Sequence, residues 1–228
     1  MKRTVVLFDM DGLMVDTEPL ARQAWERVVS PYGMGIDDGL YGQMLGRRTA
    51  ESAQLVLDAL HLPVDRDELV RRKTDEFLAS LDGGVPVMPG LWALLERIEA
   101  LGLPWAVATS TPRAVAEIVL GKLGITGRYR ALACGDEVVH GKPAPDIFLL
   151  AAARVGAPPA ACLALEDSAA GCAAAAAAGM RVAAVPTELT RGETFACAYR
   201  RYPSLAAVAA DLEALLAEES TYFPDGTH

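Results

Sequence analysis

The residues best suited to chemistry are two aspartates, Asp9 and Asp11, which follow directly after the apolar run at residues 5–8. Four consecutive apolar residues predict a strand that is buried on both faces. An unpaired carboxylate is costly to bury, so these two side chains need a cation, a proton or hydrogen-bond donors around them. Gly12 allows the backbone to turn sharply after the pair. The stretch therefore predicts a charged site at the end of a buried strand.

Three further groups of polar residues stand at the ends of predicted strands: Thr109 with Ser110 and Thr111, Lys142 in the sequence GKPAPD, and Glu166 with Asp167 and Ser168. Each group has a simpler interpretation when it is taken alone. Hydroxyl and acidic residues often begin helices, a single lysine is usually a solvated charge, and two aspartates one residue apart are common by chance. Four independent features would not all fall at one edge of one sheet, so we interpret them together as a functional site.

Together these groups have the composition of a phosphoryl-transfer site. Carboxylates from Asp9 and Asp167 are hard oxygen ligands of the kind that Mg²⁺ prefers. An aspartate can attack phosphorus to form an aspartyl-phosphate, and a second carboxyl group nearby can protonate the leaving oxygen and then activate water. Lys142 would supply positive charge to the phosphoryl oxygens. The Thr109 hydroxyl and the Ser110 amide would supply neutral hydrogen-bond donors.

The elements that must position this site alternate along the chain from about residue 103 onward. Strands are predicted at 104–109, 129–134, 162–166 and 181–185, and helices at 112–123, 145–155 and 168–178. Such alternation is typical of a parallel sheet with helices on both faces, which binds ligands at the carboxyl ends of its strands. The predicted fold class is therefore α/β with a Rossmann-like core, on which a C-terminal helix at 205–216 is expected to pack.

Residues 17–86 interrupt this alternation and contain no convincing strand. Their predicted helices span 18–29, 49–60 and 65–81, with Gly33, Gly35 and Gly39 in the loop between the first two. The third helix begins with Asp65 and Glu68, which have the spacing of a capping box. A helical insert after the first strand would lie over the strand ends as a lid. We therefore predict a core of residues 1–16 and 87–228 and an inserted, all-helical cap domain of residues 17–86.

The ordered motifs DMDGLMVDTEP, VATSTP, GKPAPD and LEDSAAG resemble those of the haloacid dehalogenase (HAD) superfamily. The likeness is strongest to its branch of small sugar-phosphate phosphatases and β-phosphoglucomutases, which carry a helical cap. This resemblance implies that Asp9 is the nucleophile and Asp11 the general acid and base, with the backbone carbonyl of Asp11 also binding Mg²⁺. It further implies phosphate-binding residues and metal ligands: Thr109 and Lys142 for the phosphate, and Asp167 with Glu166 for the metal.

One position departs from the mutases of this branch, which carry a histidine where this chain has Ala21. That histidine helps a sugar rather than water attack the phosphoenzyme, so its absence favours hydrolysis. We expect a Mg²⁺-dependent phosphatase of a small phosphorylated metabolite, with sugar phosphates as the favoured class. The alternatives are a β-phosphoglucomutase-type mutase and a non-catalytic ligand-binding protein that keeps the fold. Carbon–halogen hydrolysis is disfavoured because it would not need Asp11.

Three cations in the predicted cap are candidate substrate contacts. Lys73 lies within the apolar stripe of its helix, so it either extends past the apolar edge into solvent or points into the cleft. We adopt the second interpretation because similar enzymes have a lysine at this point. Arg47 and Arg48 follow Gly46 at the start of a helix. A solvated loop charge explains either arginine alone, and we expect one of them to bind an anionic or hydroxyl-rich leaving group.

Bulk properties limit the other partners. The 228 residues carry a formal net charge of −9 and no apolar run long enough to span a bilayer, which argues against nucleic acid and membranes as partners. The four cysteines form no metal-binding or disulfide pattern and predict buried thiols in a reducing compartment. We therefore expect a cytoplasmic protein, and a monomer. No pattern assigns a role to residues 186–202.

Overall fold

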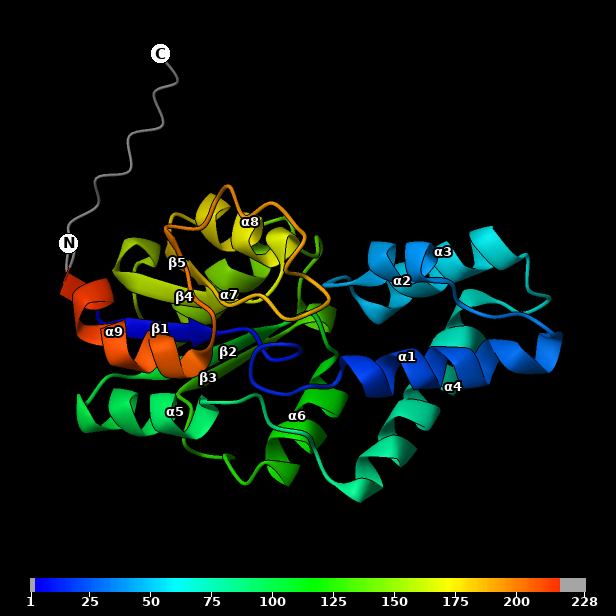
Figure 1. The fold of residues 1–228 in the computed structure, drawn as a ribbon, viewed down its shortest axis with the longest axis horizontal. Coiled ribbons are helices and arrows are strands. Elements are labelled where there is room, and N and C mark those ends of the chain that lie inside the picture. The colour runs from blue at the N-terminus through cyan, green and yellow to red at the C-terminus, as the bar shows by residue number, and fades with distance from the viewer. Residues whose placement is uncertain (1–2, 218–228) are drawn as a thin grey trace, which may run out of the picture.

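The computed structural model describes residues 3–217, which contain a six-stranded parallel sheet in the order β3-β2-β1-β4-β5-β6. The strands are β1 (Val5–Phe8), β2 (Trp105–Thr109), β3 (Ala131–Cys134), β4 (Cys162–Glu166), β5 (Arg181–Ala184) and β6 (Arg200–Arg201). Strand β1 pairs with β2 on one side and with β4 on the other (Figure 1). The carboxyl ends of these three neighbouring strands therefore bring Asp9, Thr109 and Glu166 to one edge of the sheet.

Helices cover both faces of the sheet: α5 (Leu91–Ala100), α6 (Arg113–Lys122) and α9 (Leu205–Ala217) on one face, α7 (Asp146–Val155) and α8 (Ala169–Ala177) on the other. Successive side chains of a strand point to opposite faces, so each strand contributes to both layers. Val6 and Phe8 join the apolar cluster of the first face, and Val5 and Leu7 join that of the second. All four residues are buried, as the sequence of β1 predicts, and the fold is of the α/β class.

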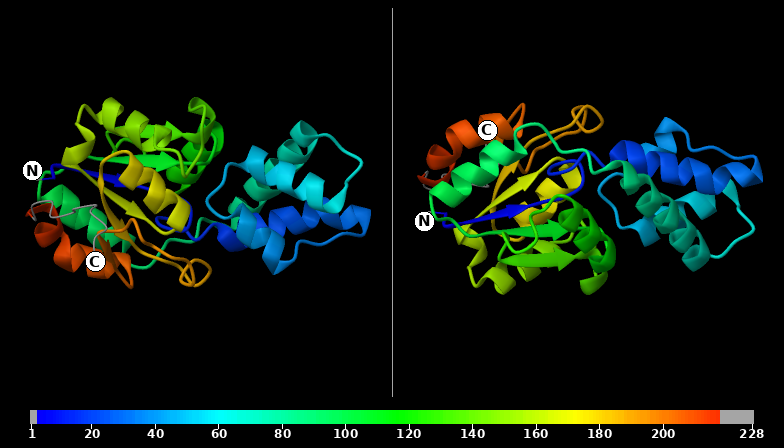
Figure 2. Two further views of the ribbon diagram at one scale, coloured as in Figure 1. Left: turned by 90° about the horizontal axis from the view of Figure 1, so that it is seen from above. Right: turned by 90° about the horizontal axis from the view of Figure 1, so that it is seen from below.

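Four helices lie together beyond the carboxyl edge of the sheet (Figures 1 and 2): α1 (Glu18–Val29), α2 (Asp38–Met44), α3 (Thr49–Leu60) and α4 (Arg66–Ser80). They share an apolar cluster of their own, which includes Trp25, Val56 and Leu69. We call residues 17–86 the helical insert. Its separation from the core as a cap domain stays a prediction, and residues 1–2 and 218–228 of the predicted core lie outside the described residues.

The chain enters and leaves the helical insert through two segments that lie side by side. The backbone amide of Asp16 donates to the carbonyl oxygen of Pro86 at 2.9 Å. One residue further into the core, Val15 pairs with Val87 in an antiparallel bridge. These two contacts hold residues 15–16 beside residues 86–87.

Two helices of the insert begin directly after a capping aspartate. A carboxylate oxygen of Asp65 accepts a hydrogen bond from the amide of Glu68 at 2.8 Å, which confirms the predicted start of α4. Asp37 caps α2 in the same way, at 2.7 Å from the amide of Leu40. The prediction of a loop around Gly39 was wrong, because this cap starts a short helix despite the glycine. Helix α5 and the two-residue strand β6 were not predicted either.

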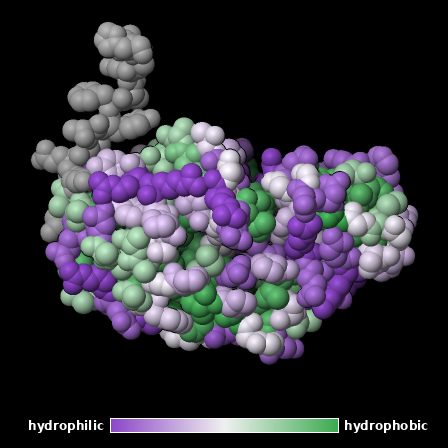
Figure 3. Space-filling model, viewed as in Figure 1, coloured by the Kyte–Doolittle hydropathy of each residue, from purple (hydrophilic) through white to green (hydrophobic). Residues whose placement is uncertain are grey.

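Other bulk features of the described chain are simple. None of the helices within residues 3–217 is both long enough and apolar enough to cross a membrane. Cys134, Cys162 and Cys172 are free and buried as predicted, whereas Cys197 is free and exposed, so the prediction of a buried thiol was wrong there. Hydrophilic and hydrophobic residues are interspersed over the face that Figure 3 shows.

Candidate active site

Asp9 and Asp11 lie at the carboxyl end of β1, on either side of Met10. Asp9 is buried, and the chain then turns at Gly12, which has a φ of 81°. A Cβ atom at Gly12 would lie 2.4 Å from Oδ2 of Asp167. A glycine is therefore needed at this turn twice over, for its backbone angle and for the close approach of a second carboxylate.

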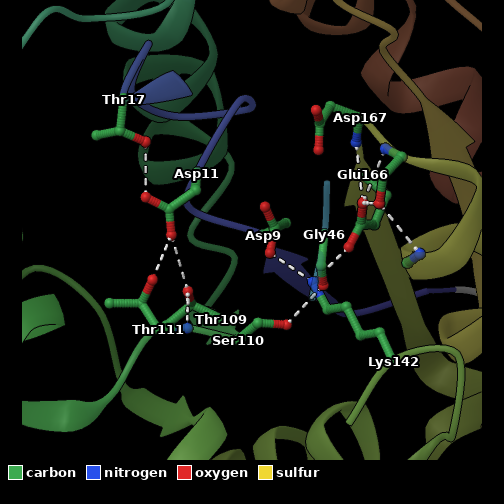
Figure 4. Close-up of polar contacts among 12 residues, drawn as sticks. Asp9, Asp11, Thr17, Gly46, Thr109, Ser110, Thr111, Lys142, Glu166 and Asp167 are labelled. Atoms are coloured by element: carbon green, nitrogen blue, oxygen red, sulfur yellow. Dashed lines mark hydrogen bonds and ion pairs between the residues drawn. The ribbon is translucent and has the colours of Figure 1, made fainter. Parts of the chain in front are cut away.

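Lys142 connects two of the predicted carboxylates. Its ammonium nitrogen lies 2.5 Å from Oδ1 of Asp9 and 2.5 Å from Oε1 of Glu166, with all three side chains buried (Figure 4). Lys142 stands in the loop between β3 and α7, eight residues beyond the end of β3 rather than at the strand end itself. Burial opposes its charge, but the two carboxylates outweigh burial and raise the pKa of Lys142 above its ordinary value. The lysine is a fixed buried cation.

Glu166 is held by hydrogen bonds on both of its oxygens. Oε1 accepts from Lys142, and Oε2 accepts from the amides of Asp167 and Ser168 at 3.0 and 3.1 Å and from the Ser168 hydroxyl at 3.0 Å. Ser168 also caps α8, where its hydroxyl accepts from the amide of Gly171 at 3.1 Å. The simpler interpretation of this group as a helix cap was thus partly right. Ser168 caps α8, and its backbone amide and hydroxyl also bind Glu166 of the site.

The carboxylates at this edge outnumber the cations beside them. One oxygen from each of Asp9, Glu166 and Asp167 lies within 4.8 Å of the others, and the Lys142 ammonium contacts two of the three, Asp9 and Glu166. Within residues 3–217, the carboxylate of Asp167 has no hydrogen-bond or ion-pair partner although it is buried. Burial, together with Glu166 and Asp9, raises the pKa of Asp167 well above its ordinary value. Burial also raises the pKa of Asp9 to about 8, partly opposed by Lys142.

This donor set fits a divalent cation. Hard oxygen ligands grouped around a buried and uncompensated carboxylate are what Mg²⁺ binds in proteins, and a cation would remove the cost of burying them. Asp9 and Asp167 have the freer oxygens, whereas both oxygens of Glu166 already accept hydrogen bonds. The side chain of Asp11 is not part of this carboxylate group, so only its backbone carbonyl stays a predicted ligand.

The Asp11 carboxylate is held by three hydroxyl groups instead. Thr17 donates to its Oδ1 at 2.7 Å, and Thr111 and Thr109 donate to its Oδ2 at 2.7 and 3.2 Å. In the view of Figure 4, Asp11 and these threonines lie on the far side of Asp9 from Asp167. Thr111 belongs to the predicted polar group at 109–111 but was assigned no role of its own, and Thr17 was missed, although both stand inside the quoted motifs. The motifs themselves do not indicate that two side chains so far apart in sequence both bind the Asp11 carboxylate.

The predicted phosphate donors at the end of β2, Thr109 and Ser110, have different surroundings. Thr109 is completely buried, and its hydroxyl lies between Asp11 and the amide of Thr111. Ser110 lines the cavity described next, and its hydroxyl donates to the carbonyl oxygen of Gly46 in the helical insert at 3.1 Å. The hydroxyl of Thr109 is therefore occupied in this structure, and its contact with phosphate stays a prediction.

A cavity lies between the carboxyl edge of the sheet and the helical insert. Asp9, Asp11, Lys142 and Asp167 line it from the core, so the predicted chemistry opens into one space. The insert contributes an apolar wall that includes Ala21, Trp25 and Phe77. The core adds a segment that the sequence left without a role, since Thr187, Leu189 and Thr190 line the same cavity.

Lys73 of α4 reaches this cavity with its side chain buried rather than extended into solvent. Its ammonium nitrogen lies 4.7 Å from the ring centre of Phe77 and 5.8 Å from that of Trp25. It forms no hydrogen bond or ion pair within the described residues. Burial lowers the pKa of Lys73, while Asp11 and Glu18 partly oppose this. The predicted apolar stripe of this helix is buried at Leu69 and Phe77, and Lys73 within it faces the cavity.

The two arginines that the sequence offers as substrate contacts, Arg47 and Arg48, differ in their positions. Arg47 lines the cavity, and its Nε donates to the carbonyl oxygen of Gln43 at 2.7 Å. Arg48 does not line it. Its guanidinium pairs with Glu51 and donates to the carbonyl oxygens of Val138 and Val139, both at 3.2 Å. Arg48 therefore fastens the insert to the loop that carries Lys142, and the geometry gives no support to a substrate contact by it.

A sequence profile of the haloacid dehalogenase-like hydrolases matches residues 4–179, which contain all four motifs and the whole helical insert. The chain belongs to this family. The hydrolase is 36% identical over 222 residues to protein CbbY from Rhodobacter capsulatus, covering 92% of this chain and 96% of the relative. It is 37% identical over 177 residues to fructose-1-phosphate phosphatase YqaB from Escherichia coli, covering 77% of this chain and 92% of the relative.

Among solved structures, the hydrolase is similar to CbbY from Rhodobacter sphaeroides in complex with xylulose-(1,5)bisphosphate. The TM-score is 0.83 at 31% identity, and the match covers 91% of this chain and 96% of that chain. This likeness extends over the sheet and the helical insert together, because it includes nearly all of the described residues. With phosphatases among relatives at this identity, the chain is a phosphoric monoester hydrolase.

Proposed function

We propose that this hydrolase is a Mg²⁺-dependent phosphatase of a small phosphorylated sugar and that it works through an aspartyl-phosphate on Asp9. The observation that carries the proposal is the buried contact of Asp9 with Lys142 beside the unpartnered carboxylate of Asp167. The carboxylate nucleophile and the phosphate ester are both anions and repel each other. Cations must therefore lie beside both groups before the carboxylate can attack. Bound Mg²⁺ would supply the second positive charge alongside Lys142.

In the first step a carboxylate oxygen of Asp9 bonds to phosphorus as the bond to the ester oxygen breaks. Asp11 gives a proton to that leaving oxygen, so the alcohol departs neutral. In the second step Asp11 takes a proton from water, whose oxygen attacks phosphorus and releases Asp9 and inorganic phosphate. Lys142 and the backbone amide of Ser110 hold the phosphoryl oxygens during both steps. The three hydroxyls around Asp11 support this division of roles, since they orient it apart from Asp9.

The helical insert acts as the cap domain that receives the sugar. Lys73 is buried, faces the cavity and lacks an anionic partner among the described residues, which supports an anionic or hydroxyl-rich group of the substrate as its ligand. Arg47 lines the same cavity and is the second candidate contact. The names of relatives support this substrate class: YqaB acts on fructose 1-phosphate, and the similar CbbY structure contains a sugar bisphosphate.

Transfer to a sugar, as in a phosphosugar mutase, is less well supported. The cavity wall has Ala21 where such mutases carry the histidine that assists the sugar's attack, and a methyl group can move no proton. Water is then the acceptor of the phosphoryl group. The four free cysteines support the cytoplasmic location expected from the sequence, since free thiols persist in reducing compartments.

A screen of phosphate release tests the proposal. The purified chain is incubated with sugar phosphates, glycerol phosphate and nucleoside monophosphates, with Mg²⁺ or with a chelator. We expect phosphate release from at least one sugar phosphate with Mg²⁺ only, none from Asp9→Asn, and wild-type rates from Asp75→Asn, an exposed aspartate on α4. Isomerised sugar phosphate from β-glucose 1-phosphate, without phosphate release, would instead identify a mutase. An active Asp9→Asn variant would exclude the mechanism.

A further inference from the structure

The segment between β5 and β6 reaches the cavity although it carries none of the motifs. It leaves the sheet at the carboxyl end of β5, the same edge as Asp9 and Glu166, and runs beside the start of the helical insert (Figures 1 and 2). Three of its residues, Thr187, Leu189 and Thr190, line the cavity. This segment of the core thus forms one wall of the cavity, in addition to the charged residues that the core contributes at the strand ends.

This wall is fixed in place by its own hydrogen bonds. The buried hydroxyl of Thr190 accepts from the amide of Thr187 at 3.0 Å. A carboxylate oxygen of Glu193 accepts from the amide of Ala169 at 2.7 Å, in the first turn of α8. That turn begins two residues after Asp167, so the segment is tied to the same stretch of backbone that presents the carboxylates. The position of its side chains relative to the reacting phosphate is therefore set by the core.

Leu189 is the side chain that this segment offers to a ligand. It is 51% exposed, and among the exposed large apolar side chains of residues 3–217 it is the one that lines the cavity. Its exposed neighbours Glu188 and Arg191 pair with each other at 3.0 Å. An apolar side chain at the rim of a polar site, with nothing over it in this structure, gains by contact with carbon atoms of a ligand.

We propose that Leu189 is a specificity-determining residue that contacts the leaving group of the substrate at the mouth of the cavity. It selects phosphate esters whose leaving group extends from the phosphate to the rim and presents C–H groups there, as a phosphorylated sugar or polyol of several carbons does. A very short leaving group, such as the acetate of acetyl phosphate, ends before the rim. This inference rests on the proposed function, because it concerns the substrate of the same site.

The test compares one long and one short substrate across three variants. The long substrate is the sugar phosphate found in the screen, and the short one is acetyl phosphate, both with Mg²⁺. For Leu189→Ala we expect kcat/KM for the sugar phosphate to fall about tenfold, mainly through KM, with acetyl phosphate unchanged. Leu189→Met should retain wild-type values because its volume and polarity are similar. Glu188→Ala, next to it but outside the cavity lining, is the matched control.

The outcomes separate the two proposals. Equal effects of Leu189→Ala on both substrates, or no effect on either, would overturn the role of Leu189 while leaving the phosphatase intact. A wild-type protein that hydrolyses neither substrate would overturn the proposed function, and this inference with it. Because Leu189 is half exposed, its variants should keep the wild-type Tm, and this is checked before the rates are compared.

Discussion

The hydroxyl of Thr17 donates a hydrogen bond to Oδ1 of Asp11 at 2.7 Å. Thr17 is the residue directly before α1, where the chain passes from the core into the helical insert. The proposed general acid is thus tied to the point at which the proposed cap is attached. A displacement of Thr17 would therefore remove the side-chain hydrogen bond on Oδ1 of Asp11.

Thr17→Val tests this link, because it removes the hydroxyl and nearly preserves the shape. We expect kcat to fall about tenfold for a sugar phosphate, whose leaving oxygen needs a proton, and much less for p-nitrophenyl phosphate, whose leaving group does not. The measurement is kcat for both esters at saturating substrate. Thr126→Val, at an exposed position outside the cavity lining, is the control. An equal loss on both esters would mean that Thr17 does not act through Asp11.

Metal removal should destabilise the protein in a pH-dependent way. Burial raises the pKa of Asp9 from 3.8 to about 8 and raises that of Asp167 as well, so without metal the folded state binds more protons than the unfolded state. The contribution of these two groups to the stability of the metal-free protein should therefore be most favourable below about pH 4. It should be lost as the pH rises to about 8. Mg²⁺ should restore it, with the largest rise in Tm near pH 8.

Differential scanning calorimetry with Mg²⁺ or a chelator checks this expectation. Asp167→Asn should be more stable than the wild type without metal near pH 8, because it removes an unpaired buried charge. The variant should also lose most of the rise in Tm that Mg²⁺ causes. Asp75→Asn should behave as the wild type. A wild-type Tm that does not respond to Mg²⁺ at neutral pH would contradict a metal site at these carboxylates.

Lys73 should cost stability and favour substrate binding. Its pKa is lowered by burial, so the folded state holds its proton less tightly than the unfolded state, and this contribution to stability improves as the pH rises towards 10.5. At neutral pH we expect Lys73→Met to raise Tm by about 2–4 °C, corresponding to ~1 kcal/mol. The same change should lower kcat/KM for the sugar phosphate by about 10- to 100-fold, the loss of a charged hydrogen bond.

Lys122→Met serves as the matched control, since that lysine is exposed and pairs with Asp82 away from the cavity. It should change neither kcat/KM nor Tm appreciably. If Lys73→Met lowered Tm and left kcat/KM intact, Lys73 would be a structural residue of the insert rather than a substrate contact.

Gly171 should be required for the turn that holds Glu166. A Cβ atom there would lie 1.8 Å from Oε1 of Glu166, the oxygen that accepts from Lys142. We expect Gly171→Ala to displace Glu166, to destabilise the protein by about 2–4 kcal/mol and to reduce activity strongly. Gly121→Ala is the control within α6, where the nearest atom would be 3.9 Å away. It should be neutral or stabilise by up to about 1 kcal/mol in urea unfolding.

Much of the fold, in the core and in the helical insert, could be predicted because local sequence signals agree with each other. The helices at 18–29 and 49–60 and the strand at 162–166 match the structure residue for residue. The apolar spacing of these elements is unambiguous, and their ends coincide with proline, capping or charged residues. The approach of Asp9 and Asp167 to one edge also followed from the predicted parallel sheet, since parallel strands end on the same side, whereas Lys142 reaches that edge from a loop.

Other features depend on tertiary contacts that no local pattern records. The sequence could not show that Arg48 turns to the carbonyl oxygens of Val138 and Val139 while Arg47 faces the cavity, because the two are neighbours with the same charge. Leu189 lies 180 residues after Asp9, and only the folded chain brings the two to one cavity. Helix α2 was missed because Gly39 lowers the helix propensity of a segment that its cap and its packing stabilise.

The most direct test of the central claim, that Asp9 carries the phosphoryl group, is reductive trapping of the phosphoenzyme. The Asp11→Asn variant is mixed with Mg²⁺ and p-nitrophenyl phosphate, whose leaving group departs without a proton, so the phosphoenzyme forms but hydrolyses slowly. Borohydride then reduces an aspartyl-phosphate to homoserine, and mass spectrometry of the peptides locates the change. We predict homoserine at position 9 only, and none without Mg²⁺ or in the variant that also carries Asp9→Asn. Modification at another carboxylate, or phosphate release at the normal rate with Asp9 never modified, would contradict it.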